Sequence, residues 1–361
     1  MVEYRARMIP LLFFDPLCPR PYSEASLREA GLAGTEASTV RVAEALDAWV
    51  AQHNRTQTDG RYRAPSAVAH VRHVVVLRDP RALTAAARLF PGARLTLWVH
   101  DRIEPGSSRG RWFESAAAEL RRLQPDIVCV SDYQRARVAA TVARLAGCEG
   151  LAVRRIYNPV DDTLVPDGTP VDPGKLVFFS SPNKGLRFAL DAFRALRRRM
   201  PDLRLCVGNP GYKSITAAAM PGVEWLGSLP HARVLAEARA ALCTFSPNFV
   251  IPETFGLVFA ESHAVGTPVL SSDCGAAREV LGDAAQLLPV SLAQRAYEAP
   301  LHRLEPRWRA VPARLADALG LFDPYIERLM RWRAGERPRV GPDARFRLSV
   351  VAGEWRQLLG S

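Results

Sequence analysis

Two carboxylates in the segment Pro252–Gly266 (PETFGLVFAESHAVG) are spaced for binding chemistry. Glu253 stands just before a predicted helix that opens at Thr254–Leu257 and runs to about Val265, and Glu261 lies two turns into it. The first turn of a helix has N–H groups without intrahelical partners and the positive end of the helix dipole, which suits a diphosphate. Glu253 and Glu261 are eight residues apart, so they cannot share one spot. One carboxylate could bind a sugar, and the other the far side of a nucleotide.

An ordinary amphipathic helix with Glu261 on its solvated face would explain the same spacing. Against that alternative, Glu261 is flanked by Phe259, Ala260 and Ala264, in a helix too apolar to be fully solvated. A buried carboxylate needs a partner, so we expect Glu261 to have one.

Four further residues lie in segments that follow predicted strands. Lys184, in the loop Ser180–Gly185 (SSPNKG), can neutralise a diphosphate as a point charge. Gly34 and Thr35 lie between a strand and a helix, where glycine permits close backbone approach. His100 ends an apolar strand. Taken singly, these positions have structural explanations: a surface lysine, a plain turn and a structural histidine.

Short apolar runs alternate with helical patterns in the first half of the chain. Helices are expected at Glu36–Leu46 and Phe113–Leu123, among others. The candidate strands are Ile9–Phe14, Trp49–Gln52, His73–Leu77, Leu95–Val99, Ile127–Val130 and Val153–Ile156. Such alternation argues for a parallel, doubly wound sheet.

The stretch Asn158–Gly174 contains four prolines and no regular period, so it is interpreted as an interdomain linker and a natural hinge. Alternation restarts beyond it, with strands expected at Leu176–Phe179, Leu203–Val207, Val223–Trp225, Ala241–Phe245 and Pro268–Ser271. Further helices are expected at Ala310–Leu321, Pro324–Ala334 and Ala344–Leu359. The pattern predicts two α/β domains in series with a cleft between them, ligands binding beyond the carboxyl ends of strands.

Glu253 and Glu261, followed by Gly266–Val269 (GTPV) and Ser271–Leu281 (SSDCGAAREVL), resemble the retaining GT-B glycosyltransferases of family 4, of the glycosyl transferases group 1. Other blocks of that family occur in order: GLAGTE at 31–36, WVHD at 98–101, VSDY at 130–133, IYNPVD at 156–161 and SSPNKG at 180–185. The resemblance covers roughly residues 9–285, with a weaker match of the last helix.

The resemblance implies an α/β chain of GT-B fold, in which two Rossmann-like doubly wound domains face a central cleft. Residues 1–165 would form the N-terminal, acceptor-side domain. Residues 166–340 would form the C-terminal domain that binds the nucleotide sugar. Residues 341–361 would be a C-terminal helix that crosses back to pack on the first domain.

The same resemblance assigns roles to residues of this chain. His100 would face the transferred sugar, Glu253 would bind sugar hydroxyls and Glu261 the ribose hydroxyls. The catalytic set would be His100, Glu253 and Lys184. The donor-binding set would be Gly34, Thr35, Ser181, Lys184, Glu253, Thr254, Phe255, Gly256, Leu257 and Glu261. Of these, Lys184, the amides of 255–257 and the Gly34 loop would stabilise the departing diphosphate.

The implied reaction is transfer from a nucleotide-diphosphate sugar with retention, by front-face attack in which the departing phosphate oxygen takes the acceptor proton. The chain has no D-x-D motif, so we expect a site that needs no metal and no cofactor besides the donor. Domain closure would exclude water. The chain departs from the family in lacking an arginine a few residues before Lys184, where Phe178–Ser181 stand. Backbone donors, the Ser180 and Ser181 hydroxyls, or another arginine could substitute.

The net charge of the 361 residues is +11, and almost all of the positive charge comes from arginine. A basic surface suits nucleic acid, anionic lipid or phosphorylated ligands equally. No nucleic-acid-binding motif supports the first, and we expect no nucleic-acid partner. Basic runs such as Arg102–Arg111 and Arg194–Arg199 could touch an anionic membrane. The six cysteines are widely spaced and imply neither a disulfide framework nor a zinc site.

No apolar run is long enough to cross a membrane, and the stretch after Arg5 and Arg7 is interpreted as a strand rather than a signal peptide. We expect a cytoplasmic protein, with peripheral contact at the inner membrane face as an option. The acceptor would be a hydroxyl of a glycan, a lipid-linked compound or a small molecule, in cell-surface glycan or secondary-metabolite glycoside synthesis. A catalytically inactive GT-B protein that only binds the sugar nucleotide is the main alternative. An epimerase, or a phosphorylase with a pyridoxal phosphate lysine, is another.

Overall fold

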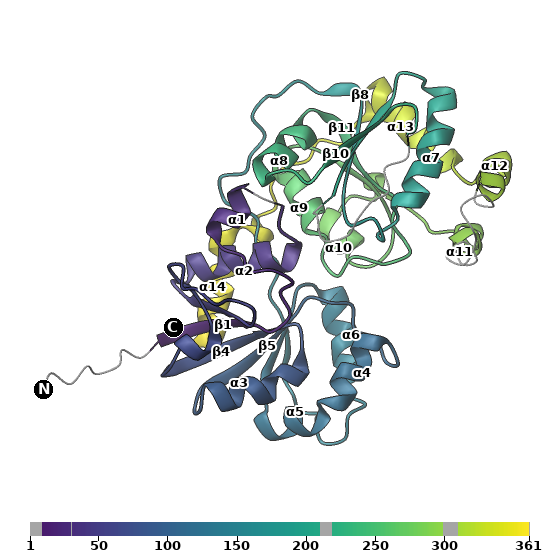
Figure 1. Cartoon of the computed structure of the whole chain (residues 1–361). Helices are drawn as coiled ribbons and strands as arrows, with labels where there is room; N and C mark the ends of the chain where they lie inside the picture. The colour runs from purple at the N-terminus through teal and green to yellow at the C-terminus, as the bar shows by residue number, and fades with distance from the viewer. Residues whose placement is uncertain (1–8, 30, 210–218, 299–309, 361) are drawn as a thin grey trace, which may run out of the picture. The chain divides into compact units, whose positions relative to one another are not determined.

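The computed structural model describes residues 9–29, 31–209, 219–298 and 310–360, and the chain divides into two compact units (Figure 1). The first unit holds the described residues among 1–27, 34–161 and 344–361. The second unit holds those among 28–33 and 162–343. Each unit is built around its own parallel sheet.

The sheet of the first unit has the strand order β3-β2-β1-β4-β5-β6-β7, with every neighbouring pair parallel. Its strands are β1 (Ile9–Asp15), β2 (Trp49–Gln52), β3 (Tyr62–Arg63), β4 (Val71–Leu77), β5 (Arg94–Val99), β6 (Asp126–Cys129) and β7 (Val153–Arg155). All six strands expected from the sequence are confirmed. The edge strand β3 is an addition, and its two residues are too few to give a periodic signal.

Helices flank this sheet: α1 (Glu24–Glu29), α2 (Gly34–Ala45), α3 (Leu83–Leu89), α4 (Ser108–Ser115), α5 (Ala117–Leu123) and α6 (Asp132–Val142), with 3-10 turns at Pro65–Ala67 and Pro80–Ala82. The single helix expected over 113–123 is wrong. The chain leaves helical geometry at Ala116, whose N–H is shared between the carbonyls of Trp112 and Phe113, so that α4 and α5 are separate.

The core of the first unit depends on the last helix of the chain, α14 (Leu348–Leu359), which follows a 3-10 turn at Ala344–Phe346. Trp355 is fully buried, with its ring centroid 4.9 Å from that of Trp98 and 6.0 Å from that of Phe13. Val160 and Arg347 form a parallel bridge that anchors the returning segment. The C-terminal helix therefore packs on the first unit.

The sheet of the second unit has the order β10-β9-β8-β11-β12-β13 and is also parallel throughout. Its strands are β8 (Asp172–Phe179), β9 (Arg204–Gly208), β10 (Val223–Gly227), β11 (Ala241–Ser246), β12 (Val269–Ser272) and β13 (Leu287–Leu288). The expected linker over 158–174 is too long, because Asp172 already pairs with Ala241 of β11. The two-sheet fold class expected from the sequence is confirmed.

The helices of this unit are α7 (Leu186–Arg199), α8 (His231–Arg239), α9 (Leu257–Ala264), α10 (Ala277–Leu281), α11 (Leu292–Glu298), α12 (Ala310–Ala318) and α13 (Asp323–Arg331). A 3-10 turn at Ala284–Gln286 precedes β13, and a π-helical turn at Trp332–Glu336 extends α13. The helix expected over 324–334 therefore changes its winding at Trp332. None of the described helices is long and apolar enough to cross a bilayer.

The strand order reverses once in each sheet, between β1 and β4 in the first and between β8 and β11 in the second. At such a point the connections after the two central strands diverge to opposite faces, which leaves a crevice at their carboxyl ends. A site in the second unit is therefore expected in the loops after β8 and β11.

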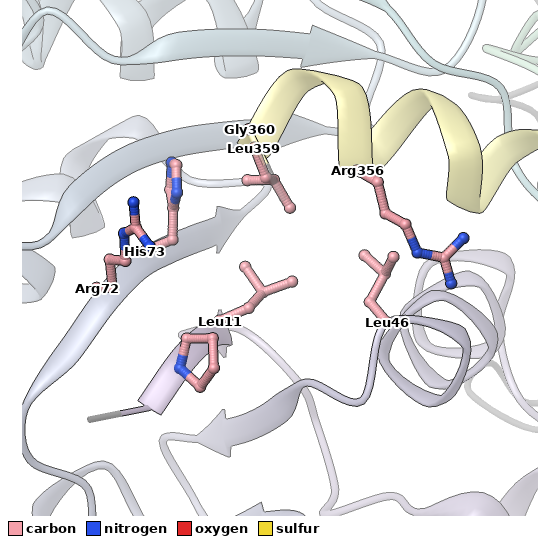
Figure 2. Close-up of a pocket in the computed structure, with 8 residues that line it drawn as sticks. Leu11, Leu46, Arg72, His73, Arg356, Leu359 and Gly360 are labelled. Atoms are coloured by element: carbon pink, nitrogen blue, oxygen red, sulfur yellow. The ribbon is translucent and has the colours of Figure 1, made fainter. Parts of the chain in front are cut away.

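In the first unit, a cavity of about 230 Å³ lies near the amino ends of the strands β1 and β4, at the edge of the sheet opposite their carboxyl ends (Figure 2). It is lined by Pro10, Leu11, Leu46, Arg72, His73, Arg356, Leu359 and Gly360. His73 is buried in its wall, and within the described part of the chain its Nε2 has no hydrogen-bond partner. Burial, together with nearby Arg94, lowers the pKa of His73 to about 4.

This histidine makes stability depend on pH. An unfolded histidine takes up a proton near pH 6.5 and folded His73 only near pH 4, so the unfolded state is protonated first as the pH falls. The contribution of His73 to the free energy of unfolding is therefore complete above pH 6.5. It decreases as the pH falls from 6.5 to 4, by up to about 1.4 kcal/mol per pH unit. Between pH 6.5 and 5, we expect the melting temperature of His73→Phe to fall less steeply with decreasing pH than that of the wild type. The exposed neighbour variant His70→Asn should keep the wild-type slope, and equal slopes for His73→Phe and wild type would contradict the assignment.

Candidate active site

The loop after β8 is a tight turn that presents Lys184. The Lys184 N–H donates to the Ser181 carbonyl at 2.8 Å, and the buried Ser181 hydroxyl donates to Asn183 within the same turn. Gly185 then opens α7 with a φ of +84°, and a Cβ there would lie 3.1 Å from the Cα of Asn248. Glycine therefore lets the β8 loop lie directly against the β11 loop.

The loop after β11 holds Glu253 through its backbone. The Asn248 carboxamide organises the start of this loop, because it accepts from the Val250 and Ile251 N–H groups and donates to the Ile251 carbonyl at 2.6 Å. Further along, the Glu253 carbonyl accepts from Ala276 N–H at 3.0 Å. The position of Glu253 is therefore set by fixed backbone contacts.

The two loops meet in an ion pair. Lys184 Nζ donates to Glu253 Oε2 at 2.7 Å, with the side chain of Glu253 8% exposed and that of Lys184 29% exposed. Since β8 and β11 are the central pair at the strand-order reversal, their loops share one crevice at the sheet edge. The expected convergence of these two side chains is confirmed.

Helix α9 begins beside this pair, at Leu257 rather than at Thr254 as the sequence suggested. Gly256 caps it in the left-handed region with a φ of +89°, where a Cβ would strike the Phe259 ring. The first backbone bond of the helix runs from the Phe259 N–H to the Gly256 carbonyl. Thr254 and Phe255 thus precede the helix, and the amides at its mouth, Leu257 among them, are those that helix geometry leaves for a ligand.

Glu261 lies farther along α9 and is mostly buried, with 11% of its side chain exposed. Its Oε1 is 2.9 Å from Nε2 of His231, the first residue of α8. The expectation that this carboxylate has a partner is confirmed. His231 was not singled out from the sequence, because it belongs to no metal or catalytic motif.

The remaining expected site residues lie in the first unit. Gly34 and Thr35 open α2, and His100 directly follows β5 with its ring centroid 4.4 Å from that of Trp98. Burial and the charge of Arg78 lower the pKa of His100 to about 3. His100 is therefore neutral at physiological pH and suited to hydrogen bonding a hydroxyl rather than to carrying a charge.

Other charged groups surround the carboxyl ends of β4 and β5. The Asp101 carboxylate accepts from Nε and Nη2 of Arg78, at 3.1 and 3.2 Å. Glu36, in the first turn of α2, is buried, and this burial raises its pKa. Its Oε2 has no partner in the described structure, and this carboxyl group was not singled out from the sequence.

Among the described residues, no group of three or more His, Cys, Asp and Glu side chains is placed to hold a metal ion. What the second unit does offer is an ammonium group, helix-mouth amides and a carboxylate beside them. The first two suit a phosphate, and a carboxylate suits the hydroxyls of a sugar.

Comparison with known proteins places this part of the chain in context. Residues 174–302 match the model of the family described as glycosyl transferases group 1. The phosphatidyl-myo-inositol mannosyltransferase of Mycobacterium tuberculosis is 33% identical over 134 residues, 34% of this chain and 35% of that protein. The D-inositol 3-phosphate glycosyltransferase of Nocardiopsis dassonvillei is 38% identical over 116 residues, 30% of this chain and 27% of that protein. The chain thus spans about a third of the length of these curated relatives.

Solved structures resemble the whole chain. HepE of Anabaena, in complex with UDP and glucose, has a TM-score of 0.62 at 15% identity and covers 98% of this chain and 99% of its own. The sucrose-phosphate synthase of Thermosynechococcus elongatus has a TM-score of 0.57 at 13% identity and covers 97% and 98%. At these identities the likeness concerns the fold. The chain therefore has the GT-B fold seen in glycosyltransferases, and its segment 174–302, which carries Lys184, Glu253 and Glu261, matches the model of the glycosyl transferases group 1.

Proposed function

We propose that this protein is a retaining glycosyltransferase that moves a sugar from a nucleotide-diphosphate donor to a hydroxyl acceptor. The observation that carries the proposal is the Lys184–Glu253 ion pair beside the mouth of α9. The names of the relatives, a mannosyltransferase and an inositol-phosphate glycosyltransferase, support the transfer of a sugar. The UDP held by the structural neighbour supports a nucleotide donor.

In this proposal Lys184 and the amides at the start of α9 bind the donor diphosphate. As the bond from the anomeric carbon to the phosphate oxygen breaks, negative charge grows on the β-phosphate, where a fixed ammonium and fixed dipoles are most effective. Glu253 accepts hydrogen bonds from sugar hydroxyls. Its negative charge is compensated by Lys184, so a carboxylate and a diphosphate can share one site.

We further propose that the acceptor hydroxyl attacks on the face from which the nucleotide leaves, so that configuration is retained. The departing phosphate oxygen takes the acceptor proton, and neutral His100 hydrogen-bonds a hydroxyl of the transferred sugar. The ammonium and the helix dipole carry the charge stabilisation, so the proposed reaction needs no metal.

The first test measures the ion pair against a matched pair elsewhere. Lys175 pairs with Glu237 at 2.6 Å, near the amino end of the same strand β8 whose carboxyl end leads to Lys184. We expect UDP, GDP or dTDP to raise the melting temperature of the wild type. Lys184→Met should lower the transfer rate by about 10²–10³-fold, the usual effect of losing one transition-state donor. Lys175→Met should keep the wild-type rate.

Several outcomes of this test are decisive. No stabilisation of the wild type by any of these nucleotides, or equal rates for the two lysine variants, would contradict the proposed site. Nucleotide binding without donor hydrolysis or transfer, unchanged in Glu253→Gln, would identify the catalytically inactive alternative.

The second test concerns how the backbone holds Glu253. Gly275 has a φ of +64°, and a Cβ there would lie 2.6 Å from the Glu253 carbonyl oxygen. Gly282, at the end of α10, has a φ of +68° with open space around it. Both alanine variants bear the cost of a left-handed residue, about 1 kcal/mol, but only Gly275→Ala displaces Glu253. We expect Gly275→Ala alone to weaken donor binding, by about tenfold or more in KM. Equal KM values would show that this contact does not position Glu253.

The acceptor and the location of the enzyme are part of the proposal. Both relatives are named for phosphorylated inositols, which supports a polyhydroxylated acceptor that carries a phosphate. We propose a cytoplasmic enzyme that touches the anionic inner membrane face peripherally. On the first unit, the guanidinium carbons of Arg81 and Arg109 lie 3.9 and 3.7 Å from the ring centroid of Trp112. An aromatic ring with adjacent cations suits a membrane interface.

Sedimentation with lipid vesicles tests this contact. We expect binding to vesicles rich in phosphatidylglycerol but not to phosphatidylcholine vesicles, and weaker binding in 0.5 M salt because charge is screened. The double variant Arg81→Ser/Arg109→Ser should weaken it by about 30-fold, at about 1 kcal/mol per arginine. The control Arg121→Ser/Arg122→Ser removes two exposed charges from α5 of the same unit and should bind as the wild type does. Equal loss in both variants would indicate net charge alone.

A further inference from the structure

The contact between His231 and Glu261 is built by two helices that run side by side. His231, Leu235 and Ala238 are spaced i, i+4 and i+7 on α8, so they share one face. Val265, the residue that caps the end of α9, lies one turn beyond Glu261. Because Leu235 and Ala238 pack with Val265 while His231 meets Glu261, these two faces are the ones in contact.

This arrangement is fixed by other contacts along the same seam. Leu235, Ala238 and Val265 are all buried and form one apolar cluster. Thr267, just beyond α9, donates its hydroxyl hydrogen to the Ala238 carbonyl at 2.8 Å. These contacts set the spacing of the two helices without the bond between His231 and Glu261. That bond therefore forms between helices whose positions are already determined.

The placement of His231 has no benefit for its own helix. It is the first residue of α8, where the dipole favours negative groups and disfavours a positive one. Its side chain is one quarter exposed and lies outside the apolar cluster. Stabilisation of α8 or of the core thus gives no reason for a histidine here, whereas the bond to Glu261 does.

We propose that His231 is a positioning residue for recognition of the ribose of the donor nucleotide, which rests on the function proposed above. Its Nε2–H donates to Oε1 of Glu261 and fixes the rotation of the carboxylate. The other oxygen, Oε2, then faces the ribose with its lone pairs in a set direction and accepts from the vicinal hydroxyls. Without His231 the carboxylate loses this constraint on its rotation, and part of the hydrogen-bond energy to the diol is lost as ordering entropy.

The experiment compares each nucleotide with its analogue that lacks the diol. Calorimetry would measure the Kd of UDP and of 2′,3′-dideoxy-UDP, or of the GDP pair if GDP binds more tightly. We expect His231→Phe to weaken UDP by about 5–30-fold and to leave the dideoxy analogue unchanged. His231→Gln, which keeps a side-chain donor, should recover part of the affinity. In turnover assays the donor KM should rise in His231→Phe while kcat stays within about twofold.

The controls separate the possible failures. Arg233→Gln removes an exposed residue from the first turn of the same helix and should bind both nucleotides as the wild type does. If the wild type binds neither UDP nor GDP, the proposed function itself fails. If Glu261→Gln loses the preference for the diol but His231→Phe keeps it, only the role of His231 is overturned. Equal weakening of UDP and its dideoxy analogue in His231→Phe would also overturn it, because it would indicate a merely structural residue.

Discussion

The candidate site of the second unit depends on one charge contact above all, the 2.7 Å hydrogen bond between the Lys184 ammonium and the Glu253 carboxylate. A diphosphate beside an uncompensated carboxylate would be repelled, and an isolated ammonium would not orient a sugar. In the proposed function the pair meets both requirements, provided that both groups reach the same point. The parallel sheet ensures this. Because β8 and β11 are neighbours, their loops begin side by side at the same edge of the sheet, on the two sides of one crevice.

Backbone rather than side-chain packing gives the site its precision. Gly185, Gly256 and Gly275 all adopt positive φ, and each stands where a Cβ would crowd a neighbouring group of the site or of α9. Through these glycines the β8 loop touches Asn248, α9 opens beside the ion pair, and the segment after β12 holds the Glu253 carbonyl. The charged side chains therefore extend from loops whose freedom is already small.

The sequence predicted the parts of this structure that depend on long patterns. Apolar runs located all the longer strands, and the order of the motifs predicted that Lys184 and Glu253 lie close together. Short elements escaped: β3 and β13 have two residues each, and the break at Ala116 lies within a pattern that is helical on both sides. The contact between His231 and Glu261 escaped for another reason. It joins residues 30 positions apart on separate helices, and only the i, i+4, i+7 spacing with Leu235 and Ala238 hinted at which way the histidine faces.

The return of α14 to the first unit has a consequence for biosynthesis. Trp355 completes a buried aromatic cluster with Phe13 and Trp98, residues that leave the ribosome more than 250 positions earlier. Until Trp355 emerges, the nascent first unit displays an unfilled apolar surface, a state in which holdase chaperones bind and aggregation begins. The second unit is continuous in sequence from Asp162 to Asp343 apart from a short earlier piece, so its own folding does not require Trp355. The first unit, whose strands are made first, can thus complete its core only after the second unit has been synthesised.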